Sequence, residues 1–368
     1  MTNRFFQRAL ASAACITVPL AVAAISAPSA SAADREGQSH LYTLSNEPGG
    51  NKVLAFNRAA NGSLTPAGSF ATGGNGSGGG LGSQGSVVVD RSHHVLVAVN
   101  AGSNSVSAFR VRANGSLTLM GTAPSGGMRP ISVAVRDQTV VVLNATSNNV
   151  SALRLDDGLT PIVGSTRSLT GAGGAEVAFA PGGERLVVTE KASNSIDVFP
   201  IDDGRIGAPT TTPSTGQTPF GFAFDPRGHL LVSNAAGGAA GASSLTSYSV
   251  RRNGVAVIDG PSPTHQSAAC WVAVSDDGRF AYVTNTASGT ITGYSVAADG
   301  TLSPLNANGL TATVGADPID AAFAGNDLYT INGGSHDITI DHLGTNGSLT
   351  DAGRIGGLPT SAVGLAVA

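Results

Sequence analysis

Seven near-copies of one pattern run along this chain, and this repetition limits the possible folds more than any other feature. Residues 96–105 read LVAVNAGSNS, and residues 186–195 read LVVTEKASNS. The unit is roughly 45–50 residues long, which is the size of one blade of a β-propeller. The fold is therefore expected to consist of repeated, similar units rather than of unrelated domains.

Each unit contains a two-residue turn between apolar, β-branched runs. The turns are Asn61-Gly62, Asn114-Gly115, Asp157-Gly158, Asp203-Gly204, Asn253-Gly254, Asp299-Gly300 and Asn346-Gly347. Asn-Gly and Asp-Gly accept the positive φ angles of a tight hairpin. Each turn therefore predicts two antiparallel strands, the third and fourth strands of its unit.

Two further strands recur in every unit. The first strand, of the type SVVVD, opens at Ser86, Ser132, Glu176, Gly221, Trp271, Asp320 and Gly364. The second strand, of the type LVAVN, ends at Asn46, Asn100, Asn144, Glu190, Asn234, Asn285 and Asn332. Four antiparallel strands per unit are typical of a propeller blade. The asparagines suit a tight turn, because their side chains bond nearby backbone and they tolerate left-handed φ.

The two ends of the repeat region complement each other. It starts in a second strand at residues 41–46 and stops after a first strand at residues 361–368. We predict an all-β, seven-bladed β-propeller, in which the C-terminal strand pairs with the three N-terminal strands and closes the ring. A β-solenoid is disfavoured, because tight Asn-Gly hairpins require antiparallel neighbours.

Residues 1–33 have the layout of a secretory signal peptide. Arg4 and Arg8 precede an apolar run at residues 9–25 and a small-residue stretch, which predicts cleavage after Ala32 or Ala33. A membrane anchor is disfavoured because the run is short. We expect a secreted protein with one propeller domain at residues 34–368.

Composition narrows the range of partners. A net charge of −4 without basic runs argues against nucleic acid and anionic membranes. Only Cys270 remains after the leader, so no internal disulfide and no cysteine zinc site is expected. We expect a monomer without cofactor, metal or membrane anchor, with a small-molecule ligand or an extracellular partner.

Propeller geometry places the candidate chemistry. The first strands line the central channel. The loops that join fourth to first strands and second to third strands form one face of the ring, here called the upper face. The other turns form the opposite face, here called the lower face. Glu176, Glu190 and Asp320 are the candidate general acids or bases, and Glu176 should face Asp320 across the channel. Candidate binding residues at the upper mouth are Gln84, Arg129, Lys191, Phe220, His265 and Trp271.

Structural explanations compete with these roles. Trp271 would also serve as a channel plug, and Cys270 as a small buried hydrophobe. A carboxylate in the channel needs a partner to offset desolvation, and Arg129 is one. Glu190 and Lys191 would also suit a solvated turn, and the glycine-rich residues 73–85 are expected to form a mobile loop near the mouth.

Several phrases resemble those of the seven-bladed lactonase propellers. They are LVAVNAGSNSVSAFRVRANGSL at 96–117, AFDPRGHLLVSN at 223–234 and FAYVTNTASGTITGYSVAADGTLSPL at 280–305. That family includes cycloisomerase-type 6-phosphogluconolactonases and 3-carboxymuconate lactonising enzymes. The phrases GSQGS, RPIS, TPFGF, AACW and DPID look like a secreted bacterial, lactonase-like branch. The family's enzymes commonly carry histidine where a first strand opens; this chain has none there, so no catalytic histidine is carried over.

Two hypotheses follow. The first is an exported lactonase-like enzyme that hydrolyses or forms a lactone or related cyclic ester at the channel mouth, with Arg129 or Lys191 stabilising negative charge. The second is a non-catalytic secreted propeller that binds a small ligand, a glycan or a protein through the same face, because a fold can be inherited without its activity.

Overall fold

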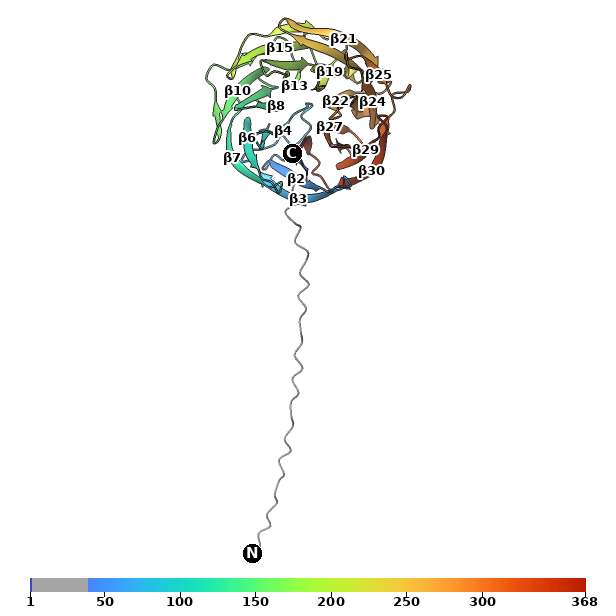
Figure 1. Ribbon diagram of the computed structural model, residues 1–368. Coiled ribbons are helices and arrows are strands. Elements are labelled where there is room, and N and C mark those ends of the chain that lie inside the picture. Colours follow the sequence, from blue (N-terminus) through green and yellow to red (C-terminus); the bar gives the residue numbers. More distant parts are fainter. Residues whose placement is uncertain (2–38) are drawn as a thin grey trace. The chain divides into compact units, whose positions relative to one another are not determined.

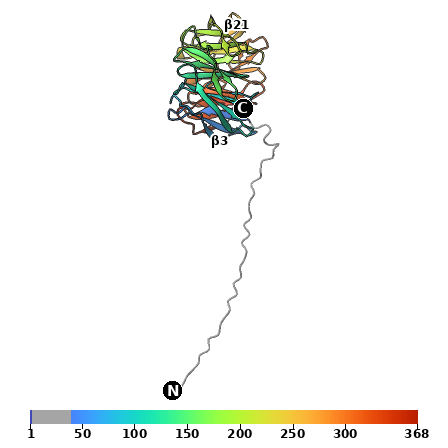
Figure 2. The same cartoon turned by 90° about the vertical axis from the view of Figure 1, so that its left-hand side faces the viewer.

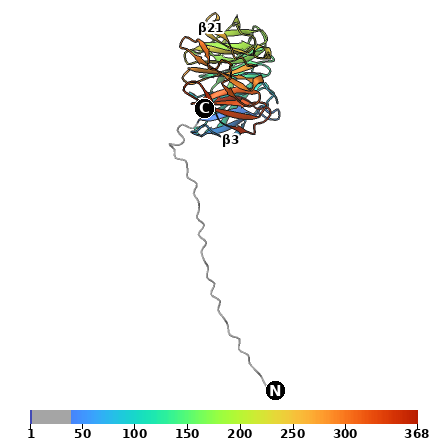
Figure 3. The ribbon, with the colours of Figure 1, turned by 90° about the vertical axis from the view of Figure 1, so that its right-hand side faces the viewer.

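Seven antiparallel sheets surround a common axis in the computed structural model (Figure 1). The structure describes residue 1 and residues 39–368, so the expected signal peptide lies outside the described residues except for Met1. Seen from the two sides, β21 and β3 lie at opposite edges of the ring (Figures 2 and 3). Among the described residues, no helix is long and apolar enough to span a membrane.

The strands of each blade follow one another from the axis outward (Figure 1). The first strands of blades 1 to 7 are β31 (Val363–Val367), β4 (Val87–Asp90), β8 (Pro130–Arg136), β13 (Gly174–Phe179), β18 (Pro219–Phe224), β22 (Ala269–Val274) and β27 (Pro318–Ala324). The second strands are β1 (His40–Leu44), β5 (Val95–Asn100), β9 (Thr139–Asn144), β14 (Arg185–Glu190), β19 (His229–Asn234), β23 (Phe280–Asn285) and β28 (Asp327–Asn332).

The outer half of each blade contains the predicted hairpins. The third strands are β2 (Lys52–Arg58), β6 (Ser105–Val111), β10 (Asn149–Leu155), β15 (Ser195–Asp202), β20 (Ser244–Arg251), β24 (Thr290–Val296) and β29 (Asp337–Leu343). The fourth strands are β3 (Leu64–Ala71), β7 (Leu117–Pro124), β11 (Leu159–Pro161) with β12 (Arg167–Ser168), β16 (Arg205–Ile206) with β17 (Thr210–Pro213), β21 (Gly254–Pro263), β25 (Leu302–Pro304) with β26 (Ala312–Thr313), and β30 (Leu349–Gly356). Two short 3₁₀ segments are described, η2 (Ala236–Gly238) and η3 (Thr286–Ser288).

The predicted ring closure is confirmed. Strand β31 pairs antiparallel with β1, with Leu41 opposite Val367 and Leu44 opposite Val363. Reciprocal backbone bonds between His40 and Ala368 extend the pairing. Blade 1 is therefore built from both ends of the described chain, which leaves β1 without an exposed inner edge.

Buried tyrosines connect neighbouring blades on the lower face. Tyr42 donates its hydroxyl to the Gly115 carbonyl at 2.9 Å, and Tyr282 donates to Gly347 at 2.8 Å. Both acceptors belong to the predicted Asn-Gly turns, where the glycines have φ of 75° and 86°. The turn of one blade is thus fixed by a side chain of the blade before it.

The asparagines that end the second strands are buried, and those of blades 2 and 6 have a role that differs from the one expected. Asn100 donates to the hydroxyls of Ser105 and Ser107, and Asn285 donates to Thr290 and Thr292. Neither asparagine has a positive φ; the left-handed position of the following turn is occupied four residues later, as at Asn104. In these blades the asparagine amide therefore joins the second strand to the third, whereas Asn46 of blade 1 has the expected left-handed φ, of 49°.

Candidate functional site

The upper end of the channel is closed by residues 80–85, here called the plug. Ser83 donates to the Ile131 carbonyl at 2.7 Å, and its own carbonyl accepts the Trp271 indole N–H at 2.9 Å. Lys191 donates to the Gly82 carbonyl at 2.5 Å. Leu81 and Ser83 are buried. The expectation of a mobile loop at residues 73–85 is therefore wrong for the plug, because blades 3, 4 and 6 hold it in place.

Gln84 completes the plug by pairing with a strand on the far side of the axis. Its amide oxygen accepts the Val272 N–H at 3.1 Å, and its amide nitrogen donates to the Val272 carbonyl at 2.9 Å. This approach requires Gly221, because a Cβ there would lie 2.2 Å from the Gln84 amide oxygen and 2.6 Å from the Cys270 carbonyl. Gly221 opens the first strand of blade 5 and has no side chain that could accept the Val272 N–H of blade 6. Gln84 accepts this N–H instead.

Replacing Gly221 by alanine is expected to destabilise the protein by about 2 kcal/mol, because the added methyl group overlaps backbone as well as Gln84. The midpoint and slope of urea unfolding would measure the loss. Gly79→Ala is the matched control, since a Cβ at Gly79 meets no atom within 4 Å. Equal stability of both variants would contradict the tight contact at Gly221.

Phe220, Trp271 and Lys191 support the plug from above. The two aromatic rings lie 5.2 Å apart, and the Lys191 ammonium sits 4.5 Å from the Phe220 ring centroid. Burial lowers the pKa of Lys191. A small cavity of about 260 Å³ remains between the plug, Trp271, Ile319 and Val363. The Trp271 indole thus holds the plug, and the half-buried Lys191 contacts the plug and the Phe220 ring rather than Glu190.

Glu176 and Asp320 line one cavity below the plug, together with Gln84. Its volume is about 330 Å³, and it extends along β4, β27 and β31 to Arg91, an exposed residue in the turn between β4 and β5. The two carboxyl groups are nearly buried, at 6% and 3% exposure. The structure therefore brings this predicted pair together, but the cavity opens towards the lower face. The upper mouth, where the sequence predicted the site, is closed by the plug.

Both carboxyl groups accept backbone hydrogen bonds from the next blade. Glu176 accepts the Phe222 N–H at 2.6 Å, and Asp320 accepts the Leu365 N–H at 3.0 Å and the Ala321 N–H at 2.9 Å. A first strand has no partner strand on its inner edge, so its N–H groups need other acceptors. Arg129, the partner suggested from the sequence, is not needed to satisfy these carboxyl groups.

The surroundings of Glu176 and Asp320 raise the pKa values of both carboxyl groups. Burial raises the pKa of Asp320 to about 7, although two backbone N–H bonds oppose the shift. Burial, with a further contribution from the nearby Asp320 charge, raises the pKa of Glu176 well above its usual value. Both carboxyl groups thus hold their protons to higher pH than exposed carboxyl groups do, and raised pKa values of this kind are a feature of general acid–base sites.

The stability of the protein should fall as the pH rises from about 5 to 8. Asp341, which is buried in β29, also has its pKa raised to about 7 by burial. In the unfolded chain aspartate side chains lose their protons near pH 4, whereas in the folded state Asp320 and Asp341 keep them until about pH 7. Ionisation therefore favours the unfolded chain across this interval. We expect a melting temperature a few degrees higher at pH 5 than at pH 8. Asp320→Asn should flatten this dependence, and an unchanged slope in that variant would contradict the raised pKa.

Glu190 lies outside this cavity lining. Its side chain is fully buried and accepts bonds from the hydroxyls of Ser193 and Ser195, at 2.8 and 2.6 Å, and from the Gly171 N–H at 3.1 Å. Burial raises the pKa of Glu190, and the charge of Asp197 raises it further. The interpretation as a solvated Glu–Lys pair is wrong, because the donors in blade 4 take up this carboxyl group.

Asp197 is the polar residue that the sequence interpretation missed. It is fully buried in β15 and accepts bonds from the Thr170 N–H and the Thr211 hydroxyl. The corresponding third-strand residues of other blades are Ser107, Ser151, Thr246, Thr292 and Thr339. The sequence could have revealed Asp197, because it is an aspartate at a position where these other blades have serine or threonine. Where those blades pair an asparagine with a hydroxyl group, blade 4 has two carboxyl groups, Glu190 and Asp197.

Arg129 and His265 occupy exposed positions on the upper face. Both have left-handed φ, of 57° and 55°, and the Arg129 N–H donates to Asn104 at 2.8 Å. They lie on the opposite side of the plug from Glu176 and Asp320. Cys270 is buried, and burial raises the pKa of its thiol to about 11. That protonated thiol fits the small hydrophobe expected there.

The comparison with known families identifies one match. The family model described as lactonase, 7-bladed β-propeller matches residues 78–168 and 158–239. No curated protein sequence matches the chain.

Solved structures share the fold at low sequence identity. A proposed 6-phosphogluconolactonase of Bacteroides uniformis is 18% identical, with 88% of this chain and 98% of that chain covered and a TM-score of 0.73. The periplasmic gluconolactonase of Pseudomonas aeruginosa is 16% identical over 90% of this chain and 98% of that chain, with a TM-score of 0.73. A streptogramin B lyase is 12% identical over 78% and 87%, with a TM-score of 0.56. The four-stranded blades closed by β31 form a seven-bladed β-propeller, and residues 78–239 of the chain are similar to the lactonase family of such propellers.

Proposed function

We propose that this protein is an exported lactonase that hydrolyses a small lactone in the cavity below the plug. The observation that carries the proposal is the pair Glu176 and Asp320, two nearly buried carboxyl groups with raised pKa values on one cavity wall. A cluster of perturbed titratable groups in a cavity favours a functional site. Similarity to the Pseudomonas periplasmic gluconolactonase supports a sugar lactone as the first substrate class to test.

Hydrolysis of a lactone needs a base and an acid. Ionised Asp320 would take a proton from a water molecule as its oxygen attacks the lactone carbonyl carbon. Protonated Glu176 would then donate its proton to the ring oxygen as the carbon–oxygen bond breaks. The net reaction adds one water to the lactone and yields one hydroxy acid, and proton exchange with solvent restores the pair.

Arg91 is the cation that this cavity offers. Its Nε donates to the Val367 carbonyl at 3.2 Å, and the residue lines the lower end of the cavity. A guanidinium there favours the negative charge of the tetrahedral intermediate and of the product carboxylate. Arg91 takes the role that the sequence suggested for Arg129 or Lys191, which both lie above the plug.

Export is the remaining part of the proposal. It rests on the charged start, apolar run and small-residue stretch of residues 1–33. Secretion of the full-length chain by a bacterial host, with a new N-terminus after Ala32 or Ala33, would support it. Retention of an uncleaved chain in the cytoplasm would contradict it.

A panel of five- and six-membered lactones tests the activity directly, with D-glucono-1,5-lactone as the first member. Acid release by the purified protein at pH 6 to 8 should exceed the uncatalysed rate measured without protein. No turnover of any lactone in the panel would overturn the proposal.

Binding without turnover is the second candidate function. It is favoured by the bonds of Glu176 to the Phe222 N–H and of Asp320 to the Leu365 N–H, because these two bonds also join neighbouring blades and so give both carboxyl groups a role without catalysis. A lactone or hydroxy acid that raises the melting temperature without being hydrolysed would support this candidate over the enzyme.

A further inference from the structure

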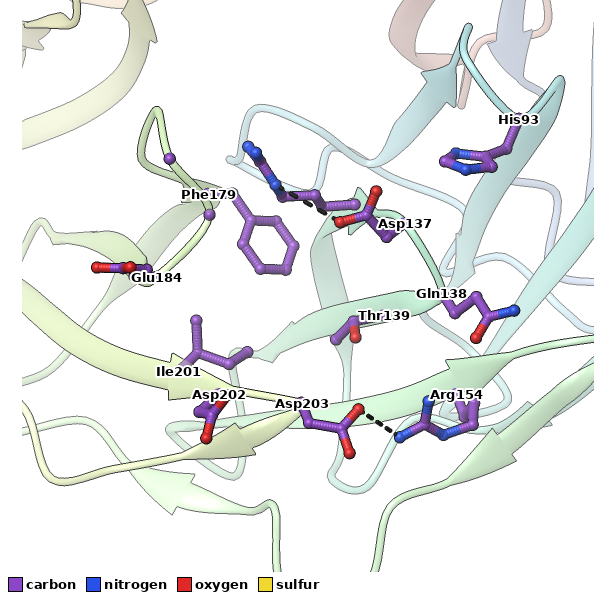
Figure 4. A pocket seen from close by; sticks show the side chains of 14 residues that line it. His93, Asp137, Gln138, Thr139, Arg154, Phe179, Glu184, Ile201, Asp202 and Asp203 are labelled. Carbon is purple, nitrogen blue, oxygen red and sulfur yellow. Dashed lines mark hydrogen bonds and ion pairs between the residues drawn. The ribbon is translucent and has the colours of Figure 1, made fainter.

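Another cavity lies on the lower face of blades 3 and 4, and its lining does not include the two carboxyl groups of the channel. Its volume is about 560 Å³. Turns following β8, β13 and β15 form its rim, and the wall between them holds the residues drawn in Figure 4. We call it the outer groove. It is large enough for several sugar-sized units rather than for one small ion.

An aromatic ring and two ion pairs share the wall of the outer groove. Phe179 is half-buried and turns its ring into the groove (Figure 4). Arg154 pairs with Asp203 at 2.8 Å, and Arg136 approaches Asp137 at 3.8 Å. A flat ring bordered by hydrogen-bond donors and acceptors suits a ligand that has both C–H surfaces and hydroxyl groups, because the ring face attracts the weakly positive C–H groups.

The charges of the outer groove select against an anionic ligand. Besides the two ion-paired acids, Glu184 and Asp202 line the groove, and neither has an ion pair among residues 39–368. Carboxylate groups therefore outnumber guanidinium groups, and a phosphate or carboxylate would be repelled. Within the same described residues, no three His, Cys, Asp or Glu side chains converge as a metal site.

The outer groove also reaches the channel entrance. Arg136 and Phe179 line a second cavity of about 380 Å³, whose wall includes Glu176. A chain-like ligand lying in the groove would thus have one end beside the channel.

We infer that the outer groove binds a neutral oligosaccharide, with one sugar ring on Phe179 and its hydroxyl groups bonded to the Arg154–Asp203 pair. A sugar hydroxyl group can accept a hydrogen bond from Arg154 and donate one to Asp203. A purely cationic ligand could bond only to the aspartate. This site is independent of lactone hydrolysis: the groove would bind the oligosaccharide whether or not the channel is catalytic.

Titration calorimetry with neutral tetrasaccharides tests the inference. The probes are maltotetraose, cellotetraose and the N-acetylglucosamine tetramer, each titrated up to about 10 mM into the full chain. At least one should bind, with a dissociation constant that stays the same between 50 and 500 mM NaCl, because a neutral ligand is not subject to charge screening.

Two variants locate the binding in the groove. Phe179→Leu keeps an apolar group of similar size for packing but removes the flat ring, and Arg154→Met removes the exposed guanidinium. Each should weaken binding at least tenfold, with melting temperature confirming that the fold is intact. Arg279→Met is the matched control, because Arg279 also pairs with an aspartate, Asp277, on an exposed lower-face turn, in blade 6.

Three results would overturn the inference. The first is no heat of binding with any tetrasaccharide, and the second is an affinity that Phe179→Leu and Arg154→Met leave unchanged. The third is tighter, salt-sensitive binding of tetralysine, which would show that the groove binds a cation. Lactone assays on the same preparations keep this outcome distinct from the proposed function, since calorimetry requires no turnover.

Discussion

Replacing Glu176 by glutamine is expected to lower the rate of lactone hydrolysis by at least about 100-fold, while the protein stays folded. A glutamine oxygen still accepts the Phe222 N–H, so the bond between blades 4 and 5 remains. The amide has no acidic proton for the ring oxygen of the leaving group. Asp320→Asn is expected to cause a similar loss, because the amide cannot accept a proton from water. The measurement is kcat/KM on the best lactone of the panel, together with the melting temperature.

Controls separate catalysis from structure. Glu190→Gln changes a buried carboxyl group of the same blade that bonds Ser193, Ser195 and Gly171 instead of lining the cavity, so its activity should equal that of the unmodified protein. Glu176→Ala, in contrast, removes the acceptor of the Phe222 N–H and should lower stability as well as activity. Full activity in both Glu176→Gln and Asp320→Asn would eliminate the assigned acid and base.

Removing residues 361–368 is expected to abolish cooperative folding. Strand β31 is the first strand of blade 1, and without it the inner edge of β1 is left unpaired. Val363 is buried in the apolar cluster that includes blades 1 and 2, and Leu365 and Val367 are buried in the cluster of blades 1 and 7, so these contacts are lost together. Asp320 also loses the Leu365 N–H. Circular dichroism melting and gel filtration of the truncated chain should show a broad transition and self-association.

A rearranged chain serves as the control for the truncation. Placing residues 357–368 before Ser39, through a short glycine–serine turn, restores β31 as the neighbour of β1. This connection is short, because Ala368 already bonds His40 across the pair. The rearranged chain should melt cooperatively. A truncated chain that melts like the intact protein would contradict the role of β31 in closing the ring.

The candidate site could be predicted only in part. That Glu176 and Asp320 approach each other follows from their equivalent positions at the openings of first strands, three blades apart. Glu190 ends a second strand and lies opposite Ser195, the first residue of the third strand. Its donors, Ser193 and Ser195, lie in the same short stretch of sequence. Whether the Glu190 carboxyl group is buried, and so needs these donors, depends on how the blades pack.

The sequence by itself determined the number of blades, the hairpins and the strand that closes the ring. Those features depend on local turn chemistry and on alternation of apolar residues, both repeated seven times. Only the tertiary structure decided from which face Glu176 and Asp320 are reached. The reason is that the path of the plug depends on bonds to Ile131, Ala175 and Trp271, which come from blades 3, 4 and 6. Contacts between residues so far apart in the chain have no periodic signal, whereas a repeated strand does.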